Sequence, residues 1–519
     1  MTLILAFIPI ALILFLMVGL RWGAARAGGA GYLSALVIAA IFFGAGPRLL
    51  AFAHMRALLL TVDVLMIIWA AFLLFRVADE AGAIETIGKA LPHLTADRGM
   101  QSLIIGWVFA SFLQGVGGFG VPVAVIAPIL VGLGFTPLAA VLLPSIGHGW
   151  AVTFGSLGSS FQALMAATGL SGEQLAPLSA LFLSISGLLV GLMVAHAAEG
   201  WSAVRRLLGP VVALGVGMGV VQFFVAISGL WNIAAFSAAL VGLVIAFPLA
   251  RGFRGEQADN GDFDLRALAV ALSGYAILIV IILCVQLIPV VKNFLGQVVI
   301  TVNFPEVGTS HGFVTPAGPG RTIPLFRHTG MVLAYSSILA YFVYRWAGLY
   351  ESGAPGRIIS GTVRRVISSS VSIASMVTMA VIMEDSGMTD ALARGLAQGI
   401  RGAFPLAAPW IGALGAFMTG SNTNSNVVFG ALQLRTAQLL GYSAALILAA
   451  QTAGAALSSV MAPTKVVVGA STAGMAGREG EVMRKLLVYT VLLVLLISLL
   501  TILGAWLGVQ GFPRITALV

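Results

Sequence analysis

The chain has 519 residues, of which 59% are hydrophobic and only 9% are charged. Soluble domains carry about 25% charged residues, so this composition excludes a soluble globular protein of this size. The net charge of +9 comes from Lys and Arg gathered in short loops, which is typical of cytoplasmic membrane loops rather than of a nucleic-acid-binding surface. The lone Cys284 excludes a disulfide framework, and no metal-ligand spacing is present, so we expect no metal and no cofactor.

Twelve apolar stretches have the length of membrane-spanning helices. A helix that crosses about 30 Å of hydrocarbon needs roughly 20 apolar residues. In chain order the predicted spans are 3–20, 31–47, 57–75, 138–168, 177–197, 205–229, 231–250, 267–290, 331–347, 363–382, 441–475 and 486–508. The first has no basic n-region or cleavage site, so we expect it to be retained. The predicted fold is an all-α polytopic membrane protein with about 12 transmembrane helices.

The second part of the chain repeats the first. Short blocks recur at matching places, namely 79–82 with 384–387, 110–115 with 415–420 (415 − 110 = 305), and 133–136 with 440–443 (440 − 133 = 307). Repeated halves with glycine-interrupted apolar segments are typical of secondary transporters. We divide the chain into N-terminal spans (1–56), a first repeat (57–200), linking spans (201–362), a second repeat (363–508) and a C-terminal tail (509–519).

The arginine positions predict the topology. Cytoplasmic ends are marked by Arg21, Arg26, Arg205, Arg206, Arg251, Arg254, Arg266, Arg345, Arg357, Arg364, Arg365, Arg478 and Arg484, with Lys485. Threading twelve spans through these marks places both termini outside and gives the two repeats opposite orientations. The outer loop 291–330 is rich in Pro, Gly and Thr, and we interpret it as a lid, a scaffold contact or a disordered segment.

Each repeat follows the same order of elements. Amphipathic arms at 76–98 and 384–401 are predicted to be helices at opposite faces of the membrane. Helix-breaking segments at 114–122 and 420–426 follow them. Irregular backbone persists at membrane depth only around a protein-lined or wet cavity, so we predict two re-entrant hairpins with tips near the midplane.

The spans after the hairpins are predicted to be broken helices. The first is interrupted by Pro144, Gly147, Gly149, Gly155 and Gly158, and the second by Gly454, Pro463 and Gly469. Helix N-termini at such breaks offer N–H donors and the positive end of a dipole. Two hairpins and two broken helices that meet at one point therefore favour a small carboxylate or other oxyanion as ligand.

The candidate binding residues lie at the hairpin tips and the breaks. Amide and hydroxyl side chains donate to carboxylate oxygens and accept from hydroxyls. The candidates are Gln114, Gly115, Gly117, Gly118, Phe119 and Gly120 in the first tip, Ser421, Asn422, Thr423, Asn424, Ser425 and Asn426 in the second, and Gln451 and Thr452 in the second broken span.

Three ionisable residues lie inside predicted spans, where charge is costly and marks function or internal pairing. Asp63 is a candidate for proton or ion coupling, or for a salt bridge within the bundle. His148 is a candidate proton carrier or carboxylate ligand, or a satisfied core histidine. Lys465 is a candidate substrate ligand, or it reaches to the membrane interface.

Two motifs resemble signatures of the lactate permease family. They are 112–123 with 130–135, and 420–433, supported by 462–464, 468–469 and 477–479. The resemblance implies proton-coupled uptake of lactate, glycolate or a similar small carboxylate across the bacterial cytoplasmic membrane, by a transport domain that moves against a scaffold. The family usually has a Glu where Gln114 stands and an Asp within the second motif near Asn422, and we expect uncharged residues at the positions of His148 and Lys465. The resemblance therefore implies that this site is more cationic than is usual in the family.

The predicted function is that of a secondary active transporter, a proton-coupled symporter for lactate, glycolate or a related small carboxylate. The alternatives are a sodium-coupled carrier of a different organic anion and an anion channel. We expect no enzyme, because His-Glu-x-x-His, Gly-x-Ser-x-Gly and paired acids within spans are all missing from the sequence. The expected partners are the substrate, a proton or sodium ion, the lipid bilayer and a second copy of the chain in a homodimer, but no nucleic acid.

Overall fold

The computed structural model describes residues 2–118, 120–253, 265–320 and 322–509, and it is nearly all helical. Within these ranges, 11 helices are long and apolar enough to cross a membrane, or 12 if the bent pair 137–151 and 155–168 forms one span. The prediction of an all-α polytopic membrane protein with about 12 spans is confirmed. The 509–519 tail lies outside the described residues except for its first residue.

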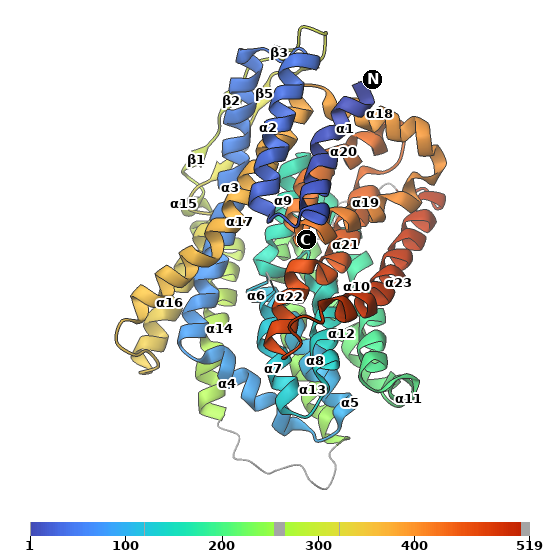
Figure 1. The fold of residues 1–519 in the computed structure, drawn as a ribbon. Coiled ribbons are helices and arrows are strands. Elements are labelled where there is room, and N and C mark those ends of the chain that lie inside the picture. Colours follow the sequence, from blue (N-terminus) through green and yellow to red (C-terminus); the bar gives the residue numbers. More distant parts are fainter. Residues whose placement is uncertain (1, 119, 254–264, 321, 510–519) are drawn as a thin grey trace.

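The helices follow the predicted order (Figure 1). The N-terminal part holds α1 (Thr2–Leu14), α2 (Ala24–Phe42) and α3 (Pro47–Glu80). Next come α4 (Ala83–Ala90), α5 (Arg98–Gln101), α6 (Ala110–Val116), α7 (Val121–Gly132), α8 (Pro137–His148), α9 (Gly155–Thr168) and α10 (Gly172–Glu199). A π-helical stretch, Ser102–Phe109, joins α5 to α6 in one continuous helical segment.

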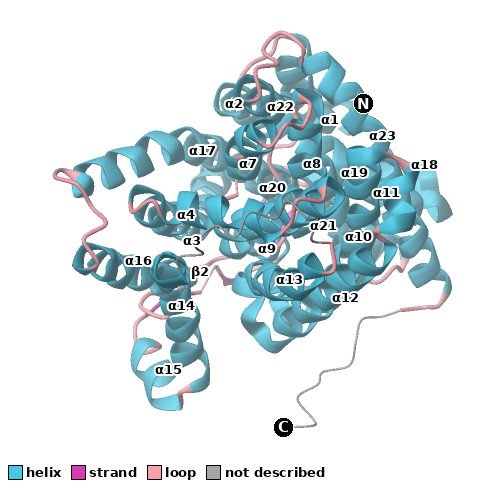
Figure 2. Cartoon of the chain, turned by 90° about the horizontal axis from the view of Figure 1, so that it is seen from below, coloured by secondary structure: helices cyan, strands magenta, loops and turns pink. Residues whose placement is uncertain are grey.

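The linking region contains α11 (Trp201–Arg206), α12 (Leu208–Val225), α13 (Ala234–Arg251), α14 (Leu265–Leu287), α15 (Pro289–Leu295) and α16 (Thr329–Trp346). The second repeat contains α17 (Ala354–Asp385), α18 (Met388–Ile400), α19 (Phe404–Thr419), α20 (Asn422–Leu440), α21 (Ala444–Ser458), α22 (Pro463–Thr472) and α23 (Glu479–Trp506). Seen from below, α14, α15 and α16 lie on one side of the molecule and α10, α18 and α23 on the other (Figure 2).

Repeat-related residues form the same local structures. Thr136 caps α8 by accepting from the Ala139 amide, and Ser443 caps α21 by accepting from the Leu446 amide. Gly82 and Gly387, with φ of 71° and 82°, start α4 and α18. Gly134 and Gly441 take φ of 84° and 73° where α7 and α20 end, a conformation that favours glycine. The sequence repeat is therefore a structural repeat.

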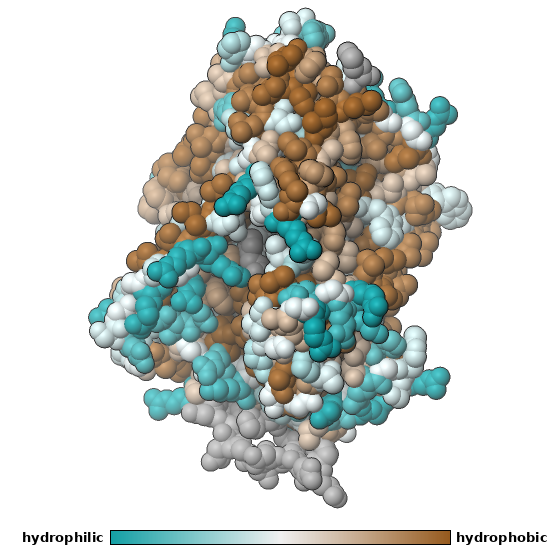
Figure 3. Space-filling view, in the orientation of Figure 1, coloured by the Kyte–Doolittle hydropathy of each residue, from teal (hydrophilic) through white to brown (hydrophobic). Residues whose placement is uncertain are grey.

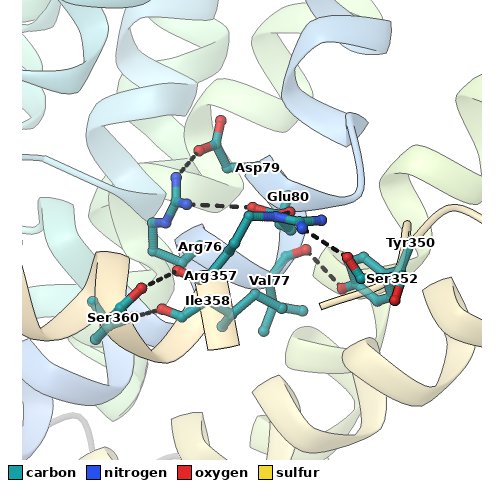
Figure 4. Close-up of polar contacts among 10 residues, drawn as sticks. Arg76, Val77, Asp79, Glu80, Tyr350, Ser352, Arg357, Ile358 and Ser360 are labelled. Atoms are coloured by element: carbon teal, nitrogen blue, oxygen red, sulfur yellow. Dashed lines mark hydrogen bonds and ion pairs between the residues drawn. The ribbon is translucent and has the colours of Figure 1, made fainter. Parts of the chain in front are cut away.

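The two repeats are inverted. At one end of the α3–α17 pair, Arg56 Nη1 lies 2.9 Å from Asp385 Oδ1, and at the other, Arg357 Nε lies 2.6 Å from Glu80 Oε1. The beginning of each helix thus contacts the end of the other, so α3 and α17 are antiparallel. Figure 4 shows the second pair, with Arg76 reaching both Asp79 and Glu80. The arms α4 and α18 lie at opposite ends of the molecule (Figure 1).

The outer loop is folded and contacts the ends of two helices. Six two-residue strands pair in antiparallel order as β1 (Val299–Ile300) with β6 (Ile323–Pro324), β2 (Asn303–Phe304) with β5 (Gly318–Pro319), and β3 (Val307–Gly308) with β4 (Val314–Thr315). The Ser310 amide donates to the Gly44 carbonyl at 2.9 Å, and Thr315 Oγ1 donates to the Asp385 carbonyl at 3.3 Å. The paired strands of the outer loop are thereby attached to the ends of α2 and α17.

The surface is consistent with a membrane protein. The face in Figure 3 is largely hydrophobic in its upper part, and hydrophilic residues gather toward its lower end. The N-terminal Leu3 contacts Gly395 of α18, and Gly504 near the end of α23 contacts Leu446 at the start of α21. Both ends of the described chain therefore lie on the side of α18.

Four predicted break positions were wrong, and two of them share a physical reason. Gly147 lies inside α8 and Gly454 inside α21, and the Pro144 and Gly469 positions are also helical. A Cβ at Gly147 would lie 1.9 Å from the Gly106 carbonyl oxygen, and one at Gly454 would lie 2.1 Å from that of Pro409. In both repeats the glycine permits a hairpin helix to pack against the following span, rather than ending a helix.

Candidate functional site

The first hairpin tip is shorter than predicted. Gln114 and Gly115 lie in α6, Gly117 and Gly118 follow its end, and Gly120 at φ 86° starts α7. A Cβ at Gly115 would lie 2.8 Å from the Phe236 backbone, which explains the glycine by helix packing. Gly118 lies against Ser156, and Gln114 lies against Gly155, so this tip contacts the break of the first broken span. Phe119 is outside the described residues.

The second hairpin tip is also shorter than predicted. Only Gly420 and Ser421 are outside helices, and 422–426 form the first turns of α20 rather than an irregular segment. The reason is the cap, because Ser421 accepts a hydrogen bond from the Asn424 amide and so starts the helix. The helical arrangement places Asn422 and Asn426 on one face and Asn424 on the other.

The asparagines of this tip bind the neighbouring elements. Asn422 Nδ2 donates to Thr153 Oγ1 at 3.1 Å, and Asn426 Nδ2 donates to Thr452 Oγ1 at 2.9 Å. Asn424 Nδ2 instead donates to Ser372 Oγ of α17 at 3.1 Å. The tip is thus bonded to both broken spans on one face and to α17 on the other.

Other predicted residues serve the packing of the same region. Thr423 Oγ1 lies 3.0 Å from Ser160 Oγ of α9. Ser425 Oγ donates to the Gly412 carbonyl at 2.8 Å, and Gln451 Nε2 donates to Ser425 Oγ at 3.1 Å. Gln451 and Ser425 therefore link α21 to the second hairpin, together with Gln433, whose Nε2 donates to Gln451 Oε1 at 3.0 Å.

The two broken spans meet beside the second tip. The first breaks between α8 and α9, where Ser156, Leu157 and Gly158 have positive φ, and its halves are bent by 49°. The second breaks at 459–462, between α21 and α22. Thr153 Oγ1 of the first break donates to the Thr452 carbonyl oxygen of α21 at 3.2 Å. The predicted convergence of hairpins and breaks is therefore present.

Lys465 lies between the two tips. A Cβ on Gly120 of the first tip would lie 4.0 Å from Lys465 Cγ, and one on Gly420 of the second would lie 2.5 Å from Thr464 Oγ1. The Lys465 side chain is buried, and its Nζ donates to Ser459 Oγ at 3.1 Å. Among the described residues, no acidic side chain forms an ion pair with this ammonium. The alternative that Lys465 reaches the membrane interface is therefore wrong.

His148 is fully buried at the end of α8, where it interacts electrostatically with the positive charge of Lys465. Its Nδ1 donates to the Pro144 carbonyl at 2.6 Å, so Nε2 carries the lone pair of a neutral imidazole. This nitrogen has no hydrogen-bond partner within the described ranges. His148 thus offers a buried acceptor near a buried cation.

Several more buried acceptors in this region lack partners in the described part of the chain. They are the side-chain oxygens of Gln114, Asn422, Asn424 and Asn426. Buried polar atoms are normally hydrogen-bonded, so an unpartnered group indicates a ligand, an ion or water. One buried cation surrounded by acceptors and by Ser and Thr hydroxyls suits a small anion that also carries a hydrogen-bond donor.

Asp63 belongs to a separate cluster. Its Oδ1 lies 2.8 Å from His328 Nε2, and its Oδ2 accepts from Gln162 Nε2 at 3.3 Å. His328 was missed by the sequence analysis, because it lies at the end of the outer loop and only the fold brings it to α3. Thr153, Ser160 and Ser372 were missed for a related reason, since their hydroxyls are unremarkable until they meet the asparagines.

A cavity on the α18 side leads toward the second tip. About 660 Å³ in volume, it is lined by Arg56, Glu384, Asp385, the end of α9 and the 313–318 loop. It adjoins a narrow apolar crevice between α3 and α17 on one side and α9 and α20 on the other, lined by residues such as Leu60, Ala163 and Val427. Ala163 and Val427 in its lining lie about one helical turn from Ser160 and Thr423, so the crevice approaches the tip.

Known proteins resemble this chain along most of its length. The family model described as L-lactate permease matches residues 2–508. The glycolate permease GlcA of Escherichia coli is 27% identical over 85% of this chain and 84% of its own. The L-lactate permease of the same organism is 26% identical over 85% of this chain and 84% of its own, and that of Streptococcus iniae is 29% identical over 73% and 78%.

Among solved structures, the YdaH transporter of Alcanivorax borkumensis aligns over 86% of each chain, with 16% identity and a TM-score of 0.48. The family match covers nearly the whole chain and agrees with the membrane fold and the bacterial inner-membrane location expected from the sequence. Its members are permeases, which confirms that no enzyme is to be expected. The chain belongs to the L-lactate permease family.

Proposed function

We propose that this chain is a proton-coupled symporter that carries lactate, glycolate or a related 2-hydroxy monocarboxylate across the bacterial cytoplasmic membrane. The family supports a permease for lactate or glycolate, and the proton coupling is our own inference. The substrate site lies between the two hairpin tips and the two helix breaks.

Lys465 is the observation that carries this proposal. A buried ammonium without an acidic partner is costly unless an anion joins it. A carboxylate at 4 Å attracts it by about 4 kcal/mol at an effective dielectric constant of about 20. The acceptors His148 Nε2 and Asn422 Oδ1 then suit the hydroxyl next to the carboxylate. A 2-hydroxy acid satisfies both requirements in one small molecule.

Transport requires the site to face each side in turn. The hairpins and breaks are joined to α3 and α17 by few polar contacts, which include Asn424 with Ser372 and Gln162 with Asp63. We propose that the hairpins and broken spans move as a unit against α3, α16 and α17, and that the apolar crevice opens in the outward state.

The test is uptake by the purified chain in liposomes. Labelled lactate, glycolate, acetate and succinate are offered under an imposed proton gradient, a sodium gradient or neither. We expect saturable uptake of lactate or glycolate that is driven by protons, with acetate weaker because it lacks the hydroxyl. Lys465→Met is the matched variant and should raise KM for the hydroxy acid.

The other outcomes separate the alternatives. Uptake driven by sodium alone would support the sodium-coupled carrier, and uptake that does not saturate would support an anion channel. Preference for succinate over the monocarboxylates would replace the proposed substrate class with a dianion.

A further inference from the structure

The Asp63–His328 pair lies apart from the substrate ligands and connects three helices. Asp63 is in the middle of α3, and His328 caps the start of α16. The two side chains are 2% and 5% exposed. Gln162 of α9 completes the cluster through its bond to Asp63 Oδ2. Asp63 is therefore a buried carboxylate that contacts both a histidine and α9. Ionisable side chains inside membrane spans usually have a function in addition to packing.

The hydrogen bonds fix the state of the histidine. The Gly330 amide donates to His328 Nδ1 at 3.1 Å, so this nitrogen holds a lone pair. The ring proton therefore sits on Nε2 and is donated to Asp63 Oδ1 at 2.8 Å. The carboxylate of Asp63 thus accepts the ring proton of His328 in the middle of α3.

Adding one proton to the pair weakens a contact between helices. A proton on Asp63 Oδ2 turns the acceptor of the Gln162 bond into a hydroxyl, which weakens the bond to α9. A proton on His328 Nδ1 removes the acceptor of the Gly330 amide, which weakens the cap of α16. In either case the proton is held at a named atom, and its arrival changes how α9 or α16 is attached to α3.

Gln162 lies within one helical turn of Ser160, which contacts the second hairpin tip. A weaker bond at Gln162 therefore affects the proposed substrate site. Ser160 of the same helix accepts from Asn426 Nδ2 through its carbonyl and contacts Thr423 through its hydroxyl. A second link runs beside the first, since Asn232 donates to Thr329 Oγ1 and lies against Gly158 at the start of α9. The end of the outer loop and the start of α16 are thus linked to α9 on both sides of Ser160, through Asp63 and Gln162 on one side and through Asn232 on the other.

Charged groups also lie on the elements around the pair. Among the described residues, α9 has no charged side chain, and α16 has only Arg345 in its last turn with Tyr335, Tyr341 and Tyr344. Arg56 lies two turns before Asp63 on α3 but is engaged by Asp385 of α17. The remaining charges on these elements are Arg48, His54, Arg76, Asp79, Glu80, Arg327, Arg357, Arg364, Arg365 and Glu384.

We infer that the Asp63–His328 pair is the proton-binding site of this transporter, and that it regulates the substrate site through Gln162 and α9. The inference rests on the proposed function, and it assigns the proton to this pair rather than to His148. His148 then serves as a hydrogen-bond acceptor for substrate.

The test separates coupling from transport in liposomes. Lactate counterflow exchanges labelled for unlabelled substrate and needs no net proton movement, whereas accumulation against a gradient does. A pH difference of one unit supports about tenfold accumulation with one proton per lactate, because one pH unit is one decade. Protein-free liposomes give the passive entry of the neutral acid.

The variants are Asp63→Asn and His328→Gln, with His54→Gln as the matched control on α3. Gln at 328 keeps an N–H for Asp63 but does not titrate. We expect both variants to retain counterflow and to lose accumulation and lactate-driven proton uptake, while the control keeps accumulation. Asp63→Glu, which retains a carboxylate, should recover part of the accumulation.

The contrary results are distinct. Full accumulation by Asp63→Asn would overturn the inference and leave the carrier intact. Loss of counterflow together with accumulation in the Asp63 and His328 variants would make the pair structural and would also overturn it. Absence of wild-type counterflow with lactate and glycolate would overturn the proposed function and this inference with it.

Discussion

The two hairpin tips occupy related places in inverted repeats, yet they offer different chemistry. The first is built from glycine, and Gly118 and Gly120 take φ of 59° and 86° so that the backbone can lie against Ser156 and Lys465. The second has two residues outside helices and then displays Asn422 and Asn426 from the first turns of α20. The first tip therefore supplies close backbone approach, and the second supplies side-chain donors and acceptors.

The difference between the tips distinguishes residues that maintain the fold from residues that are proposed to bind substrate. The arms, the Thr136 and Ser443 caps and the helix-packing glycines recur in both repeats and maintain the architecture. Lys465 has no such counterpart, because the related position holds Gly158 (465 − 307 = 158). Symmetry thus accounts for the helical framework, and Lys465, which breaks the symmetry, belongs to the proposed site.

Removal of the asparagines of the second tip should have the largest effect on uptake, and it tests whether this tip supplies the side chains of the proposed site. Asn422→Ala and Asn426→Ala each delete bonds that join the second tip to Thr153, Thr452 and the Ser160 carbonyl. Leaving buried partners unsatisfied costs about 1–3 kcal/mol, so uptake should fall by about 10- to 100-fold. Gln438→Ala, at an exposed position of the same helix, is the control and should transport normally. Near-normal uptake in both asparagine variants would place the site elsewhere.

Removal of the unpaired cation should have the next largest effect. Lys465→Met takes away the buried ammonium between the tips, and the apparent KM should rise by at least about tenfold, which corresponds to 1.4 kcal/mol. Lys465→Arg should recover only part of the affinity, because a planar guanidinium does not replace a compact ammonium. Initial uptake rates across lactate concentrations measure this. An unchanged KM in Lys465→Met would show that substrate does not contact the residue.

Much of this architecture was predictable because it depends on local sequence. Long apolar runs gave the spans, and repeated blocks around Gly82 and Gly134 marked arms and helix ends that the structure confirms. The breaks were harder to predict, since Gly147 and Gly454 break helices by propensity but are retained in helices by tertiary packing.

The composition of the site was only partly predictable. Asn422, Asn426, Thr452 and Lys465 were recognisable as polar residues in apolar surroundings. Their partners Thr153, Ser160 and Ser372 were not, because a hydroxyl in a helix usually bonds its own backbone, and only the fold shows which ones bind elsewhere. His328 is 265 residues from Asp63 in sequence, so no local pattern links the two.

The helix-packing glycines should behave alike in the two repeats. Gly147→Ala and Gly454→Ala each place a Cβ about 2 Å from a backbone oxygen that cannot move away cheaply. Such overpacking costs about 1–3 kcal/mol, so both variants should unfold at clearly lower temperature in detergent. Gly209→Ala is the control, because a Cβ there meets nothing within 4 Å and alanine favours the helix. A loss of stability in only one variant would contradict equivalent packing.

The smallest expected effects are on thermal stability and concern the two ion pairs that join α3 to α17. We expect the pair at one end of these helices to contribute more stability than the pair at the other end. The side chains of Arg56 and Asp385 are 17% and 4% exposed, whereas those of Arg357 and Glu80 are 46% and 14% exposed. Exposed pairs contribute about 0–1 kcal/mol, while breaking a buried pair leaves a charge without compensation. Glu80 also keeps Arg76 when Arg357 is lost (Figure 4).

Arg56→Gln should therefore lower the thermal midpoint more than Arg357→Gln, which should remain close to wild type. The double variant Arg56→Gln/Asp385→Asn should recover part of the loss, because it removes the uncompensated carboxylate together with its partner. Thermal unfolding of the four proteins in one detergent measures the order. An equal decrease in the thermal midpoint for Arg56→Gln and Arg357→Gln would contradict this expectation. It would show that the two ion pairs contribute equally to stability despite their different burial.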